Sequence, residues 1–165
     1  MALAHEIHQL AWPDDGGVRA ALARVIFERE ARSPGLRVSN VGGWHSHPDL
    51  LTWPDAPNQE LRERIRIGAA AVGAEELRVQ AWASVLRDGA YQVAHRHGEA
   101  VWSGVYYVDA GDGAGGTITF ARGAASCRFT PRDGLMLIFP GSLLHSVEAY
   151  DGTSARIAVA FNLFR

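Results

Sequence analysis

The strongest constraint on the fold is a change of pattern near residue 78. From there to the C-terminus, short apolar or alternating runs are separated by clusters of turn residues such as Arg87–Gly89, Asp109–Gly116 and Pro131–Gly134. Short strands at this spacing are typical of a closed or two-sheet antiparallel barrel. The expected strands are Val79–Leu86, Tyr91–His95, Val101–Val108, Thr117–Ala121, Ser126–Phe129, Gly134–Phe139, Leu144–Ala149 and Ala155–Leu163.

The part before residue 78 has the periodicity of helices. Apolar residues recur every three or four positions in Gly17–Arg32 and in Pro57–Gly73, where Leu61 and Ile65 form a stripe among charged residues. Between the two helices, Ser33–Asp55 is rich in Gly, Pro, Ser and Asn and predicts a lid-like loop. We therefore expect one mainly β domain over residues 1–165. Its helical part, residues 1–77, packs outside a barrel core formed by residues 78–165.

Composition excludes several kinds of chemistry. All sixteen cationic side chains are arginine, so Schiff-base catalysis, pyridoxal phosphate chemistry and a P-loop are excluded because each needs a lysine. The single cysteine, Cys127, excludes an internal disulfide framework and a thiolate-cluster metal site. Seven histidines remain as candidates for catalysis.

Charge and hydropathy indicate where the protein acts. The net charge of −2 provides no basic field for nucleic acid or for an anionic membrane. The sequence contains no apolar run of about eighteen residues that would span a bilayer, and its first residues do not resemble a signal peptide. With its one unpaired cysteine, the chain is expected to be cytoplasmic. Exposed strand edges favour a homodimer.

Three histidines form the best candidate for a metal site. His95 and His97 flank one residue at the end of an expected strand, where alternation places both side chains on one face. His145 begins a later strand and supplies a third ligand if the barrel brings the two strands together. Three protein ligands with open positions are typical of a catalytic metal. Glu99 is an alternative ligand, because it would complete a two-histidine, one-carboxylate triad.

Arg156 lies in an otherwise apolar strand. An arginine there usually points outward to solvent, because an uncompensated buried charge is costly. If it points inward, its planar guanidinium would hold a carboxylate through two hydrogen bonds. Since the chain has no lysine, any acid bound in the barrel must pair with an arginine.

The other histidines carry weaker signals. His45 and His47 flank Ser46 in the expected loop, where solvent exposure is the common outcome. The functional alternative is a loop that contacts substrate at the barrel mouth, with Trp44 as an apolar wall. Two further histidines, His5 and His8, lie near the terminus and are expected to be incidental.

Several of these residues occur in an order that resembles a known family. Together they are similar to a bacterial family of 2-oxoglutarate/Fe(II)-dependent oxygenases of largely unknown substrate. The resemblance covers residues from about 40 to the C-terminus. The motifs that carry it are Gly42-Gly-Trp-His-Ser46, His95-Arg-His97, Ser103-Gly-Val-Tyr-Tyr-Val108, Phe139-Pro140 with His145, and Arg156-Ile-Ala-Val-Ala-Phe-Asn162.

The resemblance implies a fold, a cofactor and a cosubstrate. The fold is a double-stranded β-helix, that is, a jelly-roll, cupin-like barrel. The family also implies Fe(II), or another divalent metal, held by His95, His97 or its neighbour, and His145. Arg156 would bind the distal carboxylate of 2-oxoglutarate, and whichever of Tyr106 and Tyr107 faces inward would add a hydrogen bond. Asn162 would line the same site.

Two features depart from the usual pattern of such oxygenases. His95-x-His97 replaces the common His-x-Asp or His-x-Glu, which leaves the metal more positive. Ala158 stands where many of these enzymes have a serine that contacts the acid. The glycine and histidine spacing around Gly89 and Gly134 also partly fits the two cupin motifs, which share the barrel.

Three functions therefore follow as expectations. The leading one is an Fe(II)- and 2-oxoglutarate-dependent dioxygenase that hydroxylates a small-molecule substrate or another acceptor. The second is a cupin-type enzyme with histidine-ligated zinc, nickel or iron and no keto acid. The third is a barrel that binds a small acid or a metal without turnover.

Overall fold

The computed structural model describes residues 3–165 and contains all eight predicted strands, each within two residues of its expected limits. Runs of apolar residues form these strands because their side chains enter one of two cores. Glycines at positive φ, such as Gly89 and Gly134, permit the tight turns between them. The strands are β4 (Arg78–Leu86), β5 (Tyr91–His95), β6 (Trp102–Asp109), β8 (Ile118–Arg122), β9 (Ala125–Phe129), β10 (Leu135–Pro140), β11 (Leu144–Val147) and β13 (Arg156–Phe164).

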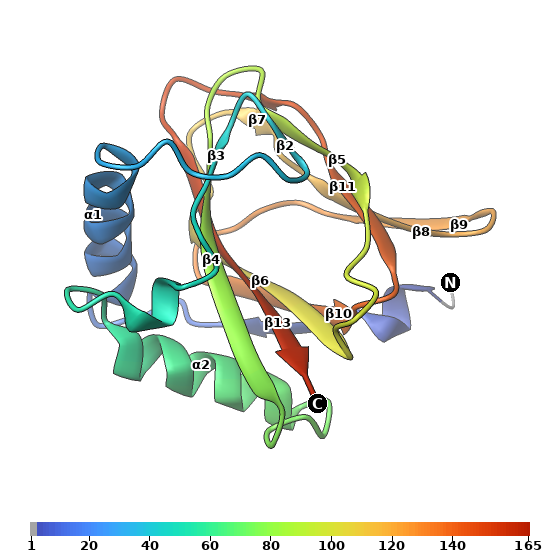
Figure 1. The fold of residues 1–165 in the computed structure, drawn as a ribbon. Coiled ribbons are helices and arrows are strands. Elements are labelled where there is room, and N and C mark those ends of the chain that lie inside the picture. Colours follow the sequence, from blue (N-terminus) through green and yellow to red (C-terminus); the bar gives the residue numbers. More distant parts are fainter. Residues whose placement is uncertain (1–2) are drawn as a thin grey trace.

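The eight strands form two antiparallel sheets. β4, β6, β10 and β13 lie in a six-stranded sheet with the order β1-β10-β6-β13-β4-β3. β5, β8, β9 and β11 lie in a five-stranded sheet with the order β2-β5-β11-β8-β9. The chain therefore passes back and forth between the sheets, and this winding is that of the predicted jelly-roll barrel, with the two sheets not closed onto each other (Figure 1).

Short strands from the N-terminal part extend both sheets. β1 (His8–Ala11) pairs with β10, and β3 (Trp44–His45) pairs with β4, so the large sheet gains a strand at each edge. β2 (Asn40–Val41) pairs with β5. The lid-like loop predicted over residues 33–55 contains short elements, namely β2, β3 and a 3-10 helix, η2 (Leu50–Thr52). Strands this short carry no periodicity that a sequence window could detect.

Two helices cover the outer face of the large sheet. Figure 1 shows α1 (Val18–Glu30) and α2 (Asn58–Ala70) on the side of β4 that faces away from β5 and β11. Each helix was predicted from its apolar stripe, and those residues are buried. The remaining elements are short: η1 (Leu3–Glu6), and a ribbon formed by β7 (Ala114–Gly115) and β12 (Tyr150–Asp151).

Burial divides the apolar side chains into two cores. One lies between the helices and the large sheet and includes Leu22, Leu61 and Phe161. The other lies between the two sheets and includes Tyr107 and Phe120. Alternation along β6 and β13 sends successive side chains to opposite cores, so each strand contributes to both layers. The space between the sheets contains the candidate site. None of the helices within residues 3–165 has the length and apolar character needed to cross a bilayer.

Candidate metal centre

His95 and His145 face each other across a strand pair. β5 and β11 are antiparallel, and the two histidines are directly paired. The register then shifts, because Val147 pairs with Gln92, so β5 has one more residue than β11 in this interval. This β-bulge turns both Gln92 and His95 toward the cavity, although strict alternation would send them to opposite faces.

His97 joins the pair from the segment that follows β5. Its backbone N–H donates to the Gly141 carbonyl at 2.8 Å, and its carbonyl accepts from the N–H of Ala100 at 2.9 Å. Gly141 lies in the turn between β10 and β11, the strand that carries His145. The backbone that presents His97 is therefore tied to the turn that precedes β11.

The three histidines form a compact group. One ring nitrogen from each of His95, His97 and His145 lies within 4.8 Å of the others. The ring centroids are 4.3 Å apart for His95 and His145, 5.1 Å for His95 and His97, and 5.3 Å for His97 and His145. Three imidazoles at this spacing match the donor set of a three-coordinate protein site for a divalent transition metal.

Backbone carbonyls orient two of the rings. Nδ1 of His95 lies 2.7 Å from the Val93 carbonyl, and Nδ1 of His145 lies 2.9 Å from the Leu143 carbonyl. A carbonyl only accepts, so each Nδ1 carries the hydrogen and each Nε2 has a free lone pair. Metal-binding histidines in proteins are commonly held in this way.

Burial keeps the three rings neutral. It lowers the pKa of His97 to about 4 and that of His145 to about 3, with a smaller contribution from the neighbouring histidines. Burial also lowers the pKa of His95. Around His145 the packing partners include the rings of Phe120 and Phe139. Neutral imidazoles need no deprotonation to bind a metal at pH 7.

Glu99, expected as an alternative ligand, does not reach the group. It is exposed in the turn after His97, and neither the histidine group nor the cavity wall includes it. The chain reverses at Gly98-Glu99 so that Ala100 can bond to His97, and this turns the carboxylate away.

Arg156 points inward rather than toward solvent. It is 2% exposed, and burial lowers its pKa. Its guanidinium lies 5.0 Å from the centre of the Tyr107 ring. The Nε of Arg156 and the hydroxyl of Tyr107 are both buried without a hydrogen-bond partner. Unpaired buried polar groups are costly, so these two donors indicate a place for an anion with oxygen acceptors.

The other two residues predicted for this end of the site lie elsewhere. Tyr106 faces the core beneath the helices, where its hydroxyl accepts a hydrogen bond from Arg64 of α2. Asn162 is buried but does not line the cavity, and its side-chain oxygen accepts from the hydroxyl of Ser103, which does. Period-2 alternation explains why only one of two adjacent tyrosines can face the cavity.

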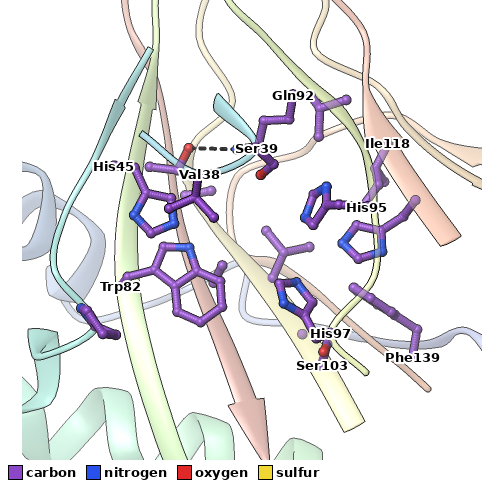
Figure 2. A pocket seen from close by; sticks show the side chains of 18 of the residues that line it. Val38, Ser39, His45, Trp82, Gln92, His95, His97, Ser103, Ile118 and Phe139 are labelled. Atoms are coloured by element: carbon purple, nitrogen blue, oxygen red, sulfur yellow. Dashed lines mark hydrogen bonds between the residues drawn. The ribbon is translucent and has the colours of Figure 1, made fainter. Parts of the chain in front are cut away.

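The three histidines and Arg156 share one cavity of about 230 Å³ between the sheets. Figure 2 shows His95 and His97 in the wall of this cavity. Its wall contains residues to which the sequence analysis assigned no role. Trp82 and Ser84 belong to β4 and Gln92 to β5. The alternation of side chains along β4 could have identified Trp82 and Ser84. They are paired with Ala160 and Ala158 of β13, which lie on the same face as Arg156. The other lining residues are Leu36, Val38, Ser39, His45, Pro48, Ser103, Gly104, Val105, Tyr107, Ile118, Phe139, Val147, Ala158 and Ala160.

The histidines of the N-terminal part separate in the structure. His45 is buried in the cavity wall, whereas His47 is exposed. Trp44 does not form the expected wall of the cavity, because it packs in the core beneath the helices. His8 packs edge-on against Trp102, and Cys127 packs against the core between the sheets, as expected for a small apolar residue.

Comparison with known proteins gives a family match and a fold match. A family model described as "Putative 2OG-Fe(II) oxygenase" matches residues 80–130 and 119–162, which together span half of the chain. These segments contain all three grouped histidines and Arg156. No curated protein matches the sequence significantly.

Solved structures with this fold include several oxygenases. A prolyl-4-hydroxylase of Pseudomonas putida superposes with a TM-score of 0.72 at 17% identity, covering 97% of this chain and 92% of its own. A Trichoplax adhaerens prolyl hydroxylase, solved with a hypoxia inducible factor peptide, gives 0.75 at 10% identity, with coverages of 96% and 83%. The α-ketoglutarate-dependent carbocyclase SnoK of nogalamycin biosynthesis gives 0.74 at 14% identity, with coverages of 98% and 81%. At these identities the likeness establishes the double-stranded β-helix fold.

Proposed function

The chain belongs to the 2OG-Fe(II) oxygenase family, and from this premise we propose that His95, His97 and His145 hold its Fe(II) while Arg156 and Tyr107 bind its 2-oxoglutarate. The observation that carries the proposal is the presence, in one cavity, of three neutral imidazoles and a fully buried arginine with an unpaired donor. The protein is an oxygenase, and we propose that it hydroxylates its substrate.

The residues present fit both groups. Free Nε2 lone pairs on His95 and His145 are suitable donors for iron. Arg156 and Tyr107 together offer a guanidinium and a hydroxyl, both of which donate to a carboxylate. The fit of an acid here also accounts for two buried donors that are otherwise unpaired.

The ligand set differs from a triad that contains a carboxylate. Within residues 3–165, the histidine group includes no carboxylate, so the bound metal would keep its full positive charge. That charge strengthens the attraction for a dianionic keto acid. The extra attraction compensates for Ala158, which lacks the hydroxyl that other enzymes use to contact the acid.

The side chains of this protein position the reactants and keep water out. Arg156 would hold the distal carboxylate at one end of the cavity, and Tyr107 would donate to the same group. Ile118, Val147 and Phe139 give the wall an apolar surface that excludes water. When bound, Fe(II) supplies the oxygen-activating redox chemistry that no side chain in the cavity can perform.

The test compares His145→Ala with His47→Ala, a control at an exposed histidine. Each protein is loaded anaerobically with Fe(II) and dialysed. Retained iron is then measured by elemental analysis, and oxygen-dependent succinate release by chromatography. We expect His145→Ala to weaken iron binding by at least about 100-fold. Removing a metal ligand should reduce the affinity for iron more than removing a residue that only supports a ligand. Equal iron retention by the two variants would contradict the proposed ligand set.

Arg156→Met separates this function from that of a three-histidine metal enzyme that uses no keto acid. We expect unchanged iron content and a weakening of 2-oxoglutarate binding by about 30-fold or more, because charge-assisted hydrogen bonds are lost. Calorimetric titration with 2-oxoglutarate measures this directly. Metal-dependent activity that survives the substitution would favour a histidine-ligated metal enzyme that uses no keto acid.

A further inference from the structure

His45 and Trp82 form a stacked pair in the cavity wall. Their ring centroids are 5.4 Å apart and their planes are inclined by 16°. Trp82 also lies 5.7 Å from His97, so the stack adjoins the histidine group. Figure 2 shows His45 and Trp82 on one side of the cavity and His95 and His97 on the other. We call His45 and Trp82 the stacked pair.

The backbone around His45 is firmly held. The residue pairs with Ser84 of β4, and its carbonyl accepts the N–H of Leu36 at 2.8 Å. The adjacent Ser46 accepts the N–H of Ala83 on its hydroxyl and donates its own N–H to the Ala83 carbonyl. A ring on such a support is fixed in place before any ligand arrives, which is what a recognition residue requires.

One hydrogen bond determines what His45 presents to the cavity. Its Nδ1 lies 2.6 Å from the carbonyl of Ser46, so Nδ1 carries the hydrogen. The hydrogen bonds within residues 3–165 give Nε2 no partner. Burial lowers the pKa of His45, which keeps the ring neutral. The Nε2 atom is therefore a hydrogen-bond acceptor.

The stacked pair is displaced from Arg156 along and across the large sheet. On β13, Arg156 is paired with Leu86, whereas Ala160 is paired with Trp82, and four residues of an extended strand span about 13 Å. His45 is paired with Ser84, which faces Ala158, so its backbone lies two residues along the sheet from Arg156 and is separated from β13 by β4. A keto acid anchored at Arg156 would therefore leave the stacked pair free to contact a second molecule.

The wall on the side of the stacked pair carries no formal charge. Of the residues that line the cavity within the described chain, Arg156 is the one with a permanently charged side chain. Besides His45, the segment that carries it contributes Leu36, Val38, Ser39 and Pro48 to the cavity lining, and Gln92 of β5 is neutral as well. A charged ligand group placed here would have no partner of opposite charge, so the wall favours an uncharged ligand.

We propose that His45 is a specificity-determining residue, whose Nε2 accepts a hydrogen bond from an uncharged N–H or O–H group of the substrate while Trp82 packs against its apolar part. The substrate class is thus a neutral amide or alcohol group rather than an acid or an amine. This assignment deepens the proposed function and rests on it for the identity of the reaction, but not for the binding itself.

The first test examines the wild-type protein without substitutions. Long-range ¹H–¹⁵N correlation spectra of the histidine rings show which nitrogen carries hydrogen. We expect Nδ1–H and a bare Nε2 for His45 at pH 7.5, with its signals assigned by their absence in His45→Phe. A hydrogen on Nε2 would overturn the proposal, because the ring would then donate rather than accept.

The second test uses N-methylacetamide, which has an N–H donor, and N,N-dimethylacetamide, which has none. Binding is followed through the indole N–H signal of Trp82 in metal-free protein. We expect the wild type to bind N-methylacetamide about three- to tenfold more tightly than its dimethyl analogue, in keeping with one neutral hydrogen bond. His45→Phe retains a ring that can stack on Trp82 and should lose this preference, whereas the control His47→Phe should keep it.

The outcomes distinguish this proposal from the function on which it rests. A preference that persists in His45→Phe, or no preference in the wild type, would overturn the role of His45 even if the protein binds iron and 2-oxoglutarate. A preference lost only in His45→Phe supports the role even if iron binding fails. If His45→Phe does not fold, His45→Leu, which likewise has no acceptor atom, replaces it in the probe assay and in the assignment of the histidine signals.

Discussion

At the scale of single residues, burial determines the protonation of the histidines in the cavity. His97 and His145 have pKa values of about 4 and about 3, compared with 6.5 for a free side chain, chiefly because the cavity disfavours the charged ring. In the unfolded chain these rings return to their ordinary pKa. Protonation therefore favours the unfolded state, and stability depends on pH wherever the two states bind different numbers of protons.

We predict that the metal-free protein loses stability as the pH falls below 6.5. The stability contribution of the neutral rings is fully present above pH 6.5 and declines as the pH falls toward 4 for His97 and toward 3 for His145. Between pH 6.5 and 5 the loss is on the order of 2 kcal/mol per histidine. Urea unfolding at pH 7.5 and 5.0 measures it. His145→Phe should show a smaller pH dependence than the wild type, and an equal dependence in both proteins would contradict the prediction.

A second residue-scale prediction concerns the hydroxyl of Tyr107. Because this buried hydroxyl has no hydrogen-bond partner among residues 3–165, Tyr107→Phe should leave the free energy of unfolding unchanged or raise it by about 1 kcal/mol. The same substitution should weaken 2-oxoglutarate binding by about five- to tenfold, since one hydrogen bond to the acid is lost. Thermal unfolding and calorimetric titration give the two values. A large loss of stability would show that the hydroxyl has a structural role instead.

At the scale of elements, strand pairing explains the motif Ser103-Gly-Val-Tyr-Tyr-Val108 in β6. Alternate residues Ser103, Val105 and Tyr107 line the cavity, while Tyr106 and Val108 enter the core beneath the helices. Gly104 is paired with Phe161 of β13, and a Cβ on Gly104 would lie 2.2 Å from Cζ of that ring. Glycine is needed here because a larger side chain would not fit. The φ angle of Gly104 is one that any residue adopts, so backbone conformation does not require glycine.

We predict that Gly104→Ala is destabilising by about 1–3 kcal/mol or more, because the Phe161 ring must move within a packed core. Gly98→Ala is the matched control, since nothing lies within 4 Å of its Cβ position. The control should change stability by less than about 0.5 kcal/mol. Chemical denaturation compares the two. Adding Phe161→Leu to Gly104→Ala should recover part of the loss, and failure to do so would contradict the steric explanation.

At the scale of the whole molecule, Arg64 joins the helical layer to the large sheet. It is 7% exposed, it donates to the hydroxyl of Tyr106 on β6 and, at 3.0 Å, to the carbonyl of Asp15. Its guanidinium also lies 5.6 Å from the centre of the Trp12 ring. The cation thus connects α2, β6 and the segment before α1, and the sequence pattern had placed it only among the charged residues of a helix.

We predict that Arg64→Met lowers the free energy of unfolding by about 2 kcal/mol, since it leaves the hydroxyl of Tyr106 buried without a partner. Iron and 2-oxoglutarate binding should be unchanged, because Arg64 and the side chain of Tyr106 lie between the helices and the large sheet, and the cavity lies on the other side of that sheet. The double variant Arg64→Met/Tyr106→Phe should be more stable than Arg64→Met alone, as both polar partners are then removed. Urea unfolding of the three proteins tests this, and additive losses would rule out the coupling.

The fold and the chemistry could largely be predicted from the sequence, because both depend on local pattern and residue type. Turn residues separated eight strands at their correct positions, and two apolar stripes marked the helices. The same sequence limited the candidate chemistry to histidine and arginine, since it contains no lysine and one cysteine. Strands β1, β2, β3, β7 and β12 were missed because two to four residues are too few to show a period.

Which side chains face the cavity was decided only by the tertiary structure. A bulge in β5 sets the direction of His95, and the reversal at Gly98-Glu99 turns the carboxylate away. The sequence by itself determined that His145 and Arg156 would lie in strands, but not that they share one cavity with His45. That juxtaposition depends on register and on the packing of two sheets, which are long-range properties that no local window contains.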